Sequence, residues 1–210
     1  MRLEHDLLGN FEVPSDAYWG VHTGRAVQNF PITGVPIGHY RSLIRALALV
    51  KQAAADANLE VGEMDQDAHD AIVKACIEVA EGKFDSQFVV DAIQGGAGTS
   101  TNMNANEVIA NRGHVVNGGQ LLDEQKVLNP NDDVNKSQSS NDTYPTAMHI
   151  AAYKMTVETT LPGLLHLRAV LQGKVEQFKD VVKTGRTHFM DATPLTLGQE
   201  FSGYVAQIDN

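Results

Sequence analysis

The fold is decided by one stretch near the middle of the chain, Gly96-Ala97-Gly98-Thr99-Ser100-Thr101-Asn102-Met103-Asn104-Ala105-Asn106-Glu107-Val108-Ile109-Ala110-Asn111. Its glycines offer backbone N–H groups at low steric cost, and hydroxyl and amide side chains follow before a helix predicted to start near Met103. Free N–H groups at a helix N-terminus suit an anionic ligand. A flexible linker, or an N-cap provided by Ser100 or Asn102, explains the same residues. The spacing matches neither the P-loop nor the dinucleotide fingerprint.

A second polar segment, Ser139-Ser140-Asn141-Asp142, precedes the longest helical pattern of the chain. That pattern predicts a helix from about Asp142 to Val182, with an interruption at Leu161-Pro162-Gly163. Two hydroxyls and an amide at a helix start can cap the helix, and the same donors can bind a carboxylate. Both interpretations stay open on these residues alone.

A third segment, Gly185-Arg186-Thr187-His188, places one histidine beside a threonine and an arginine. Such a histidine can act as a general acid or base near neutral pH, although a lone histidine is more often structural. None of the other seven histidines forms a spaced cluster with Cys, Asp or Glu of metal-ligand type. The sequence therefore predicts no metal and no cofactor.

Composition excludes several classes of protein. The 210 residues are 42% hydrophobic and carry a net charge of -10, without a basic patch, which argues against nucleic-acid and membrane-surface partners. Cys76 is the only cysteine, so no internal disulfide forms, and its apolar neighbours predict a buried side chain. The first residues lack the apolar region of a signal peptide, and no apolar run approaches the roughly 20 residues of a membrane span. We therefore expect a cytoplasmic protein.

The helical periodicity predicts a mainly α fold. Further helices are expected at 40–58, at 65–81 and from about Thr196 to the end of the chain, with short extended pieces near 11–13 and 88–90. A shift in composition near residue 135 separates short helices and long loops from the long helical pattern. We therefore predict a smaller N-terminal domain over 1–135 and the beginning of a helical bundle over 136–210.

Taken together, the three segments resemble the aspartase/fumarase superfamily of lyases. Four other pieces fit the same family, namely Asn129-Pro130-Asn131-Asp132, Asp191–Phe201, Asp6-Leu7-Leu8-Gly9 and Tyr18–Thr23. The resemblance spans essentially the whole chain, in order and without large gaps. It implies an N-terminal lyase domain followed by the start of a central helical bundle. Because family members run to more than twice this length, we expect the chain to be a truncated N-terminal portion.

Within the superfamily, the resemblance is closest to the aspartate ammonia-lyases. Gly-Ala-Gly-Thr-Ser at 96–100, Gly20–Thr23 and Asn29–Gly34 lean that way, whereas Ser139-Ser140-Asn141 and 196–204 resemble fumarases about as well. The resemblance implies an anti elimination of ammonia from L-aspartate that gives fumarate. The alternatives are fumarate hydratase and an inactive fragment that only assembles or binds a partner.

The resemblance also implies the roles of individual residues. Four residues would bind the carboxylates and the amino group of a small dicarboxylate substrate: Thr99, Ser139, Ser140 and Asn141. Thr187 and His188 would act as catalytic residues that complete the pocket from a neighbouring subunit, because family members are homotetramers with shared active sites. The base, a serine, comes from a loop beyond residue 210, so we expect this portion alone to be inactive. Asn129 replaces the histidine of a second anion site in fumarases, and that site is not expected here.

Overall fold

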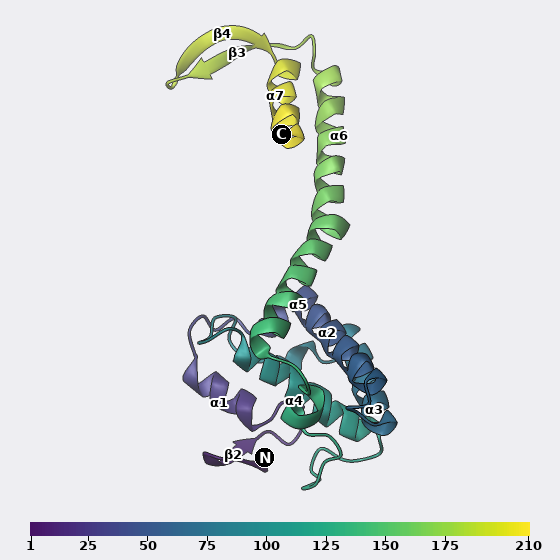
Figure 1. Cartoon of the computed structure of the whole chain (residues 1–210). Coiled ribbons are helices and arrows are strands. Elements are labelled where there is room, and N and C mark those ends of the chain that lie inside the picture. The colour runs from purple at the N-terminus through teal and green to yellow at the C-terminus, as the bar shows by residue number, and fades with distance from the viewer. The chain divides into compact units, whose positions relative to one another are not determined.

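The computed structural model describes residues 1–210, which form two compact units, Met1–Ala152 and Tyr153–Asn210 (Figure 1). Seven α-helices dominate the secondary structure, and the strands form only two small antiparallel pairs. The predicted mainly α class is therefore confirmed. The predicted domain boundary near residue 135 stays a prediction, although most of the helix that follows it belongs to the first unit.

The first unit contains a β-hairpin, four complete helices and most of a fifth. These elements are β1 (Arg2–Asp6), β2 (Gly9–Val13), α1 (Val21–Asn29), α2 (Arg41–Glu60), α3 (Gln66–Ala80), α4 (Thr99–Val116) and α5 (Ser140–Met155). Short 3₁₀ turns lie at Ile37–His39 and Asp85–Gln87, and a π-helical turn lies at Pro130–Val134.

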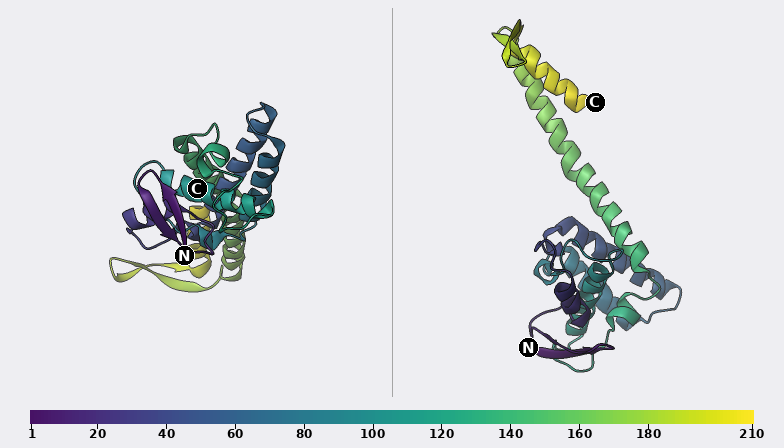
Figure 2. Two further views of the ribbon diagram at one scale, coloured as in Figure 1. Left: turned by 90° about the horizontal axis from the view of Figure 1, so that it is seen from below. Right: turned by 90° about the vertical axis from the view of Figure 1, so that its left-hand side faces the viewer.

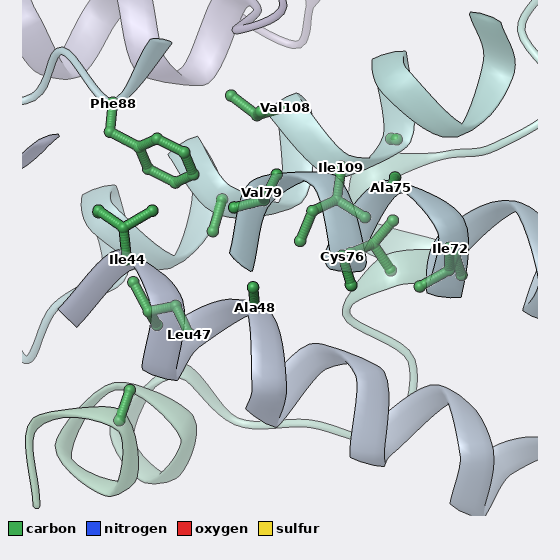
Figure 3. Close-up of a cluster of buried hydrophobic side chains, with 14 of the residues drawn as sticks. Ile44, Leu47, Ala48, Ile72, Ala75, Cys76, Val79, Phe88, Val108 and Ile109 are labelled. Atoms are coloured by element: carbon green, nitrogen blue, oxygen red, sulfur yellow. The ribbon is translucent and has the colours of Figure 1, made fainter. Parts of the chain in front are cut away.

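The core of the first unit lies where α2, α3 and α4 pack together (Figure 3). The periodicity of the sequence predicts α2 and α3 to within two residues at each end. The four residues predicted to face inward from α3 are all buried: Ile72, Ala75, Cys76 and Val79. Full burial of an aliphatic side chain contributes about 1.5–3 kcal/mol, so this layer stabilises the frame that holds the loops described below.

Helix α1 was not predicted, because its N-terminus is capped from far along the chain. The Glu107 carboxylate of α4 accepts hydrogen bonds from the backbone N–H groups of Gly20 (2.8 Å), His22 (2.8 Å) and Thr23 (3.1 Å). Glu4 accepts from the N–H of Val21 at 2.8 Å. A helix start leaves orphan N–H groups, and here distant carboxylates satisfy them instead of a local capping residue. The sequence therefore carries no local start signal.

The strands of the first unit were predicted only in part. The extended piece at 11–13 is the end of β2, which pairs with β1 from Arg2↔Val13 to Asp6↔Gly9. The extended piece near 88–90 forms no regular strand. It lies beside 35–38, where the Ile37 N–H donates to the Val90 carbonyl at 2.8 Å and Pro36 and Asp91 form an isolated antiparallel bridge.

The second unit contains a helix, a hairpin and a second helix. Its elements are α6 (Leu161–Gln177), β3 (Val182–Thr187), β4 (Met190–Thr196) and α7 (Leu197–Asp209). Helix α7 lies beside α6 (Figures 1 and 2), and Arg168 of α6 is paired with Asp209 of α7. The capping box of Thr196 and Gln199 starts α7 where the sequence predicts a helix start.

Two expectations for the second unit are wrong. The long helical pattern ends at Gln177, and residues 182–196 form a β-hairpin that the sequence analysis did not predict. The irregularity expected at Leu161-Pro162-Gly163 lies one turn earlier, as a π-helical turn at Thr156–Thr160. Pro162 lies directly after this turn in an uninterrupted helical run, because Thr160 and Leu161 both have right-handed helical φ and ψ, so its ring and missing N–H disturb the preceding turn of the helix.

Helix α6 carries apolar side chains that remain exposed. No α6 residue is buried, and five of its apolar side chains are 41–66% exposed: Leu161, Leu164, Leu165, Leu167 and Val170. These five residues are called the α6 apolar stripe below. None of the helices combines the length and the apolar character needed to cross a bilayer.

Candidate functional site

The N-terminus of α4 leaves backbone donors free. The helix starts at Thr99, four residues earlier than predicted, and its N-cap is Gly98 in the left-handed region at φ +81° without a side-chain cap. Capping by Ser100 or Asn102 is therefore not observed. The N–H of Thr101 donates to Gln94 Oε1 at 2.9 Å, whereas the N–H groups of Thr99 and Ser100 have no protein acceptor. Two N–H groups at the positive end of a helix dipole are thus available to an anion.

The N-terminus of α5 also leaves backbone N–H donors free. The Ser139 carbonyl accepts from the N–H groups of Asp142 and Thr143, both at 3.0 Å, but the N–H groups of Ser140 and Asn141 have no protein acceptor. The side chains of Ser139 and Asn141 are exposed and make no hydrogen bond within the chain. The side chains of Ser139 and Asn141 therefore do not cap α5.

The starts of α4 and α5 lie together although about 40 residues separate them. Asn102 Nδ2 donates to Ser140 Oγ at 3.1 Å, and Thr143 Oγ1 donates to Asn102 Oδ1 at 3.2 Å. Gly98 lies so close to the Tyr144 ring that a Cβ atom there would collide with it. The structure thus brings the loop that carries Thr99 next to the three polar residues at 139–141. Both positive helix ends contribute to the same place.

The loop before Thr99 is anchored by Gln94 and Asp91. Gln94 Nε2 donates to the Thr101 hydroxyl at 2.5 Å and to the Asp91 carbonyl at 3.3 Å. The Asp91 carboxylate accepts from the N–H groups of Thr33 (2.7 Å) and Gly34 (2.8 Å), among others. Burial acts to raise the pKa of Asp91, but these hydrogen bonds outweigh it and hold the pKa well below its ordinary value. The anchor is therefore a carboxylate at neutral pH.

A buried lysine behind this place was missed by the sequence analysis. Lys51 of α2 is fully buried, and its Nζ donates to Asn135 Oδ1 and to Gln138 Oε1, both at 2.9 Å. The same Asn135 oxygen accepts from Asn102 Nδ2 at 2.9 Å and from Asn106 Nδ2 at 3.2 Å. No carboxylate pairs with the ammonium, and burial lowers the pKa of Lys51 to about 7.

A sequence signal for Lys51 existed. It lies four residues after Leu47 and four before Ala55, so all three share the buried face of α2. A lysine on the apolar stripe of a helix is rarely fully buried unless its charge is paired or hydrogen-bonded. Its partners in the loop at 135–138 lie more than 80 residues further along the chain, which hid them from pattern analysis.

The second unit carries the two predicted catalytic residues in the turn of its hairpin. Thr187 pairs with Met190 across β3 and β4, so His188 and Phe189 form a two-residue loop. Both loop residues have positive φ, +50° and +58°, as a type I′ turn requires. Residues with a Cβ atom lose roughly 1–2 kcal/mol each in this region, where Asn-Gly is the usual pair. Thr187 and His188 are exposed and make no side-chain hydrogen bond.

A separate cavity of about 750 Å³ lies in the first unit but does not include Thr99 or 139–141. Its lining contains Glu107, Lys126 and Asn129. The Asn129 side chain accepts from the N–H groups of Asn131 (2.8 Å) and Asp132 (3.0 Å), so it caps the π-helical turn. Within residues 1–210, no three His, Cys, Asp or Glu side chains are grouped as metal ligands.

Comparisons with known proteins match nearly the whole length of the chain. A family model described as Lyase matches residues 9–210. The fumarate hydratase class II of Pasteurella multocida (strain Pm70) is 54% identical over 99% of this chain and 44% of its own length. The aspartate ammonia-lyase of Pseudomonas aeruginosa is 52% identical over 99% of this chain and 43% of its own.

Solved structures agree with these matches. A fumarate lyase:delta crystallin from Brucella melitensis superposes with a TM-score of 0.92 at 47% identity, covering all of this chain and 47% of that one. A class II fumarase from Schistosoma mansoni gives 0.87 at 40% identity, covering 99% of this chain and 43% of that one. The chain thus spans about half the length of the relatives that it matches.

Proposed function

Because this chain belongs to the lyase family that contains the aspartases and fumarases, we propose that its full-length version eliminates ammonia from L-aspartate to give fumarate. "Full-length version" here means a protein of the relatives' length that contains this chain. The reaction is a reversible anti elimination across the Cα–Cβ bond. Residues 1–210 supply the part of the site that binds the substrate carboxylates.

The meeting of the α4 and α5 N-termini carries this proposal. Each helix start leaves two N–H groups free. The two starts are joined by the Asn102–Ser140 hydrogen bond and carry the hydroxyls of Thr99, Ser139 and Ser140 and the amide of Asn141. Removal of a Cβ proton from the substrate places additional negative charge on its β-carboxylate. Donors fixed in advance, together with two positive helix ends, stabilise this aci-carboxylate more than the ground state. Such a site needs no metal.

In this proposal the Ser140 hydroxyl acts as a hydrogen-bond donor to the substrate. Its oxygen accepts the hydrogen bond from Asn102, and its proton has no acceptor within the chain. A hydroxyl in that state donates to whatever acceptor binds in front of it, which here is a substrate carboxylate. Thr99, the first residue of α4, offers its exposed hydroxyl to the same carboxylate.

Thr187 and His188 complete the pocket in this proposal. We propose a homotetramer in which a neighbouring subunit contributes the hairpin turn, as the family resemblance implies. The turn at His188 and Phe189 is strained, because both residues carry a Cβ atom at positive φ, and strain of this kind clusters at functional sites, which supports a functional role. His188 is assigned to binding or proton relay, and the base is a serine from a segment beyond residue 210.

The leaving group separates two candidate reactions. Ammonia is favoured by the resemblance of Gly-Ala-Gly-Thr-Ser at 96–100 to the aspartases. Water, which would make the protein a fumarate hydratase, is favoured by the number of fumarate hydratases among the relatives, including the one at 54% identity. Both reactions give fumarate and use the same carboxylate donors.

Binding of succinate, an unreactive dicarboxylate, tests the proposed donors. In the full-length version, Ser140→Ala and Thr99→Ala should each weaken succinate binding by ~1–3 kcal/mol, because each leaves a charged group short of one hydrogen bond. Thr146→Ala is the matched control, since Thr146 is exposed on α5 and makes no hydrogen bond. Unchanged calorimetric affinity in both site variants would reject the assignment of these loops.

A further inference from the structure

Lys51 places an ionisable nitrogen in an unfavourable setting. Its side chain is fully buried, and its Nζ contacts two amide oxygens but no carboxylate. A buried charge without a counter-ion destabilises the folded chain, whereas an apolar side chain of the same volume would not. The position therefore suits methionine better than lysine, unless the ammonium does something that methionine cannot.

The Lys51 nitrogen fixes the orientation of the amides around it. It donates to both residues, which an ammonium and a neutral amine can each do, so Asn135 and Gln138 turn their oxygens toward it. The Nδ2 group of Asn135 then donates to the Gln138 carbonyl at 3.1 Å, and Gln138 Nε2 donates to the Val134 carbonyl at 2.9 Å. The loop that leads into Ser139 is therefore held around one buried nitrogen.

The orientation of the Asn135 amide also sets that of Asn102, which contacts Ser140. Because Asn135 presents its oxygen, Asn102 turns its Nδ2 group toward it at 2.9 Å and its Oδ1 toward the Thr143 hydroxyl. The Nδ2 group of Asn102 also donates to Ser140 Oγ at 3.1 Å. Ser140 is thus an acceptor on its inner side, and its proton is directed outward.

We propose that Lys51 is a positioning residue for dicarboxylate binding, which acts through Asn135 and Asn102 to make the Ser140 hydroxyl a donor. This inference rests on the proposed function, because it assigns a role within the same site. It also explains why a lysine occupies the buried face of α2. Lys51 touches no ligand itself, and its effect reaches the site only through the two asparagines.

A double-mutant cycle on the full-length version tests the link. Calorimetry with succinate compares the parent, Lys51→Met, Ser140→Ala and the double variant. Each single change should raise the Kd about tenfold, and the double variant should stay near tenfold instead of reaching about a hundredfold, because both changes remove the same hydrogen bond. A lysine that only stabilises the fold would not produce this coupling.

Lys126→Met is the matched control. Lys126 is a partly buried lysine of the first unit, but its Nζ donates to Asn111 Oδ1 and lies near Glu4, with no connection to Ser140. In this background, Ser140→Ala should keep its full effect of about tenfold. Should Lys51→Met fail to fold, Asn135→Ala breaks the same link from the loop side, and the same coupling to Ser140→Ala is expected.

The outcomes separate this inference from the proposed function. Independent effects of Lys51→Met (or Asn135→Ala) and Ser140→Ala on a parent that produces fumarate would overturn the inference and leave the function intact. Coupled effects on a parent that binds succinate but produces no fumarate would support the inference and reject the reaction. A parent that binds no succinate would overturn both.

Discussion

Replacing Lys51 with methionine in the 210-residue chain makes the burial of its charge measurable through pH. Burial lowers the pKa of Lys51 from 10.5 to about 7 in the folded chain, whereas the unfolded chain keeps the ordinary value. Between these two pH values the unfolded chain holds a proton that the folded chain has lost. The free energy of unfolding of the parent should therefore rise with pH across this window, and the Lys51→Met variant should lack this rise.

The magnitude follows from the two pKa values. The slope approaches about 1.4 kcal/mol per pH unit well inside the window and is smaller near pH 7, so the gain between pH 6 and pH 9 is about 2–3 kcal/mol. The stability difference at a single pH is less informative. Methionine removes the buried charge, but it also leaves the Gln138 oxygen without its donor, which costs about 1–3 kcal/mol in the opposite direction.

Urea unfolding followed by tryptophan fluorescence is the assay. The chain has one tryptophan, Trp19, which packs against the core of the first unit and so reports on the unit that contains Lys51. Subtracting the variant from the parent at each pH removes the contribution of the histidines, which both share. Parallel stability profiles for parent and variant from pH 6 to pH 9 would refute the claim that burial depresses this pKa.

Three further predictions concern other parts of the chain. His188→Ala in the full-length version should lower kcat/KM roughly ten- to a thousandfold with little change in thermal unfolding, and a change within twofold would make the residue structural. Gly98→Ala should destabilise the chain by more than the ~1 kcal/mol expected for Gly118→Ala. Both glycines have positive φ, but only at Gly98 would a Cβ atom collide with the Tyr144 ring, so equal losses of stability in chemical denaturation would contradict that contact. The α6 apolar stripe should drive the 210-residue chain to associate, so light scattering that reports a monodisperse 22.8 kDa monomer would refute the need for a partner.

The sequence predicts those helices whose buried face and caps are encoded by residues close together in the chain. The apolar stripes of α2 and α3 repeat every three to four residues, and Asp65 caps α3 by accepting from the Ala68 N–H at 2.8 Å. Helix α1 escaped prediction because Glu107, more than 80 residues away, supplies its cap. The β3–β4 hairpin escaped because its turn is His188-Phe189 in place of the usual Asn-Gly.

The candidate site was likewise predicted only where its signals are local in the sequence. The polar segments at 99 and 139–141 were identified from their residue types at helix starts, and the structure brings these two starts together. Lys51 was missed because a lysine on a helix is usually assigned to the surface, and its acceptors lie on a distant loop. The roles assigned to Thr99, Ser139, Ser140, Asn141, Thr187 and His188 stay predictions that the binding and kinetic experiments above address.

Fumarate absorbance of the full-length version, measured with L-aspartate and separately with L-malate, tests the central claim most directly. The account predicts that absorbance rises with L-aspartate, that the rise is lost or strongly reduced in Ser140→Ala, and that Thr146→Ala behaves like the parent. A rise with L-malate alone would replace ammonia by water as the leaving group and make the protein a fumarate hydratase. No rise with either substrate, from a folded protein, would contradict the proposal that the paired starts of α4 and α5 serve an elimination that yields fumarate.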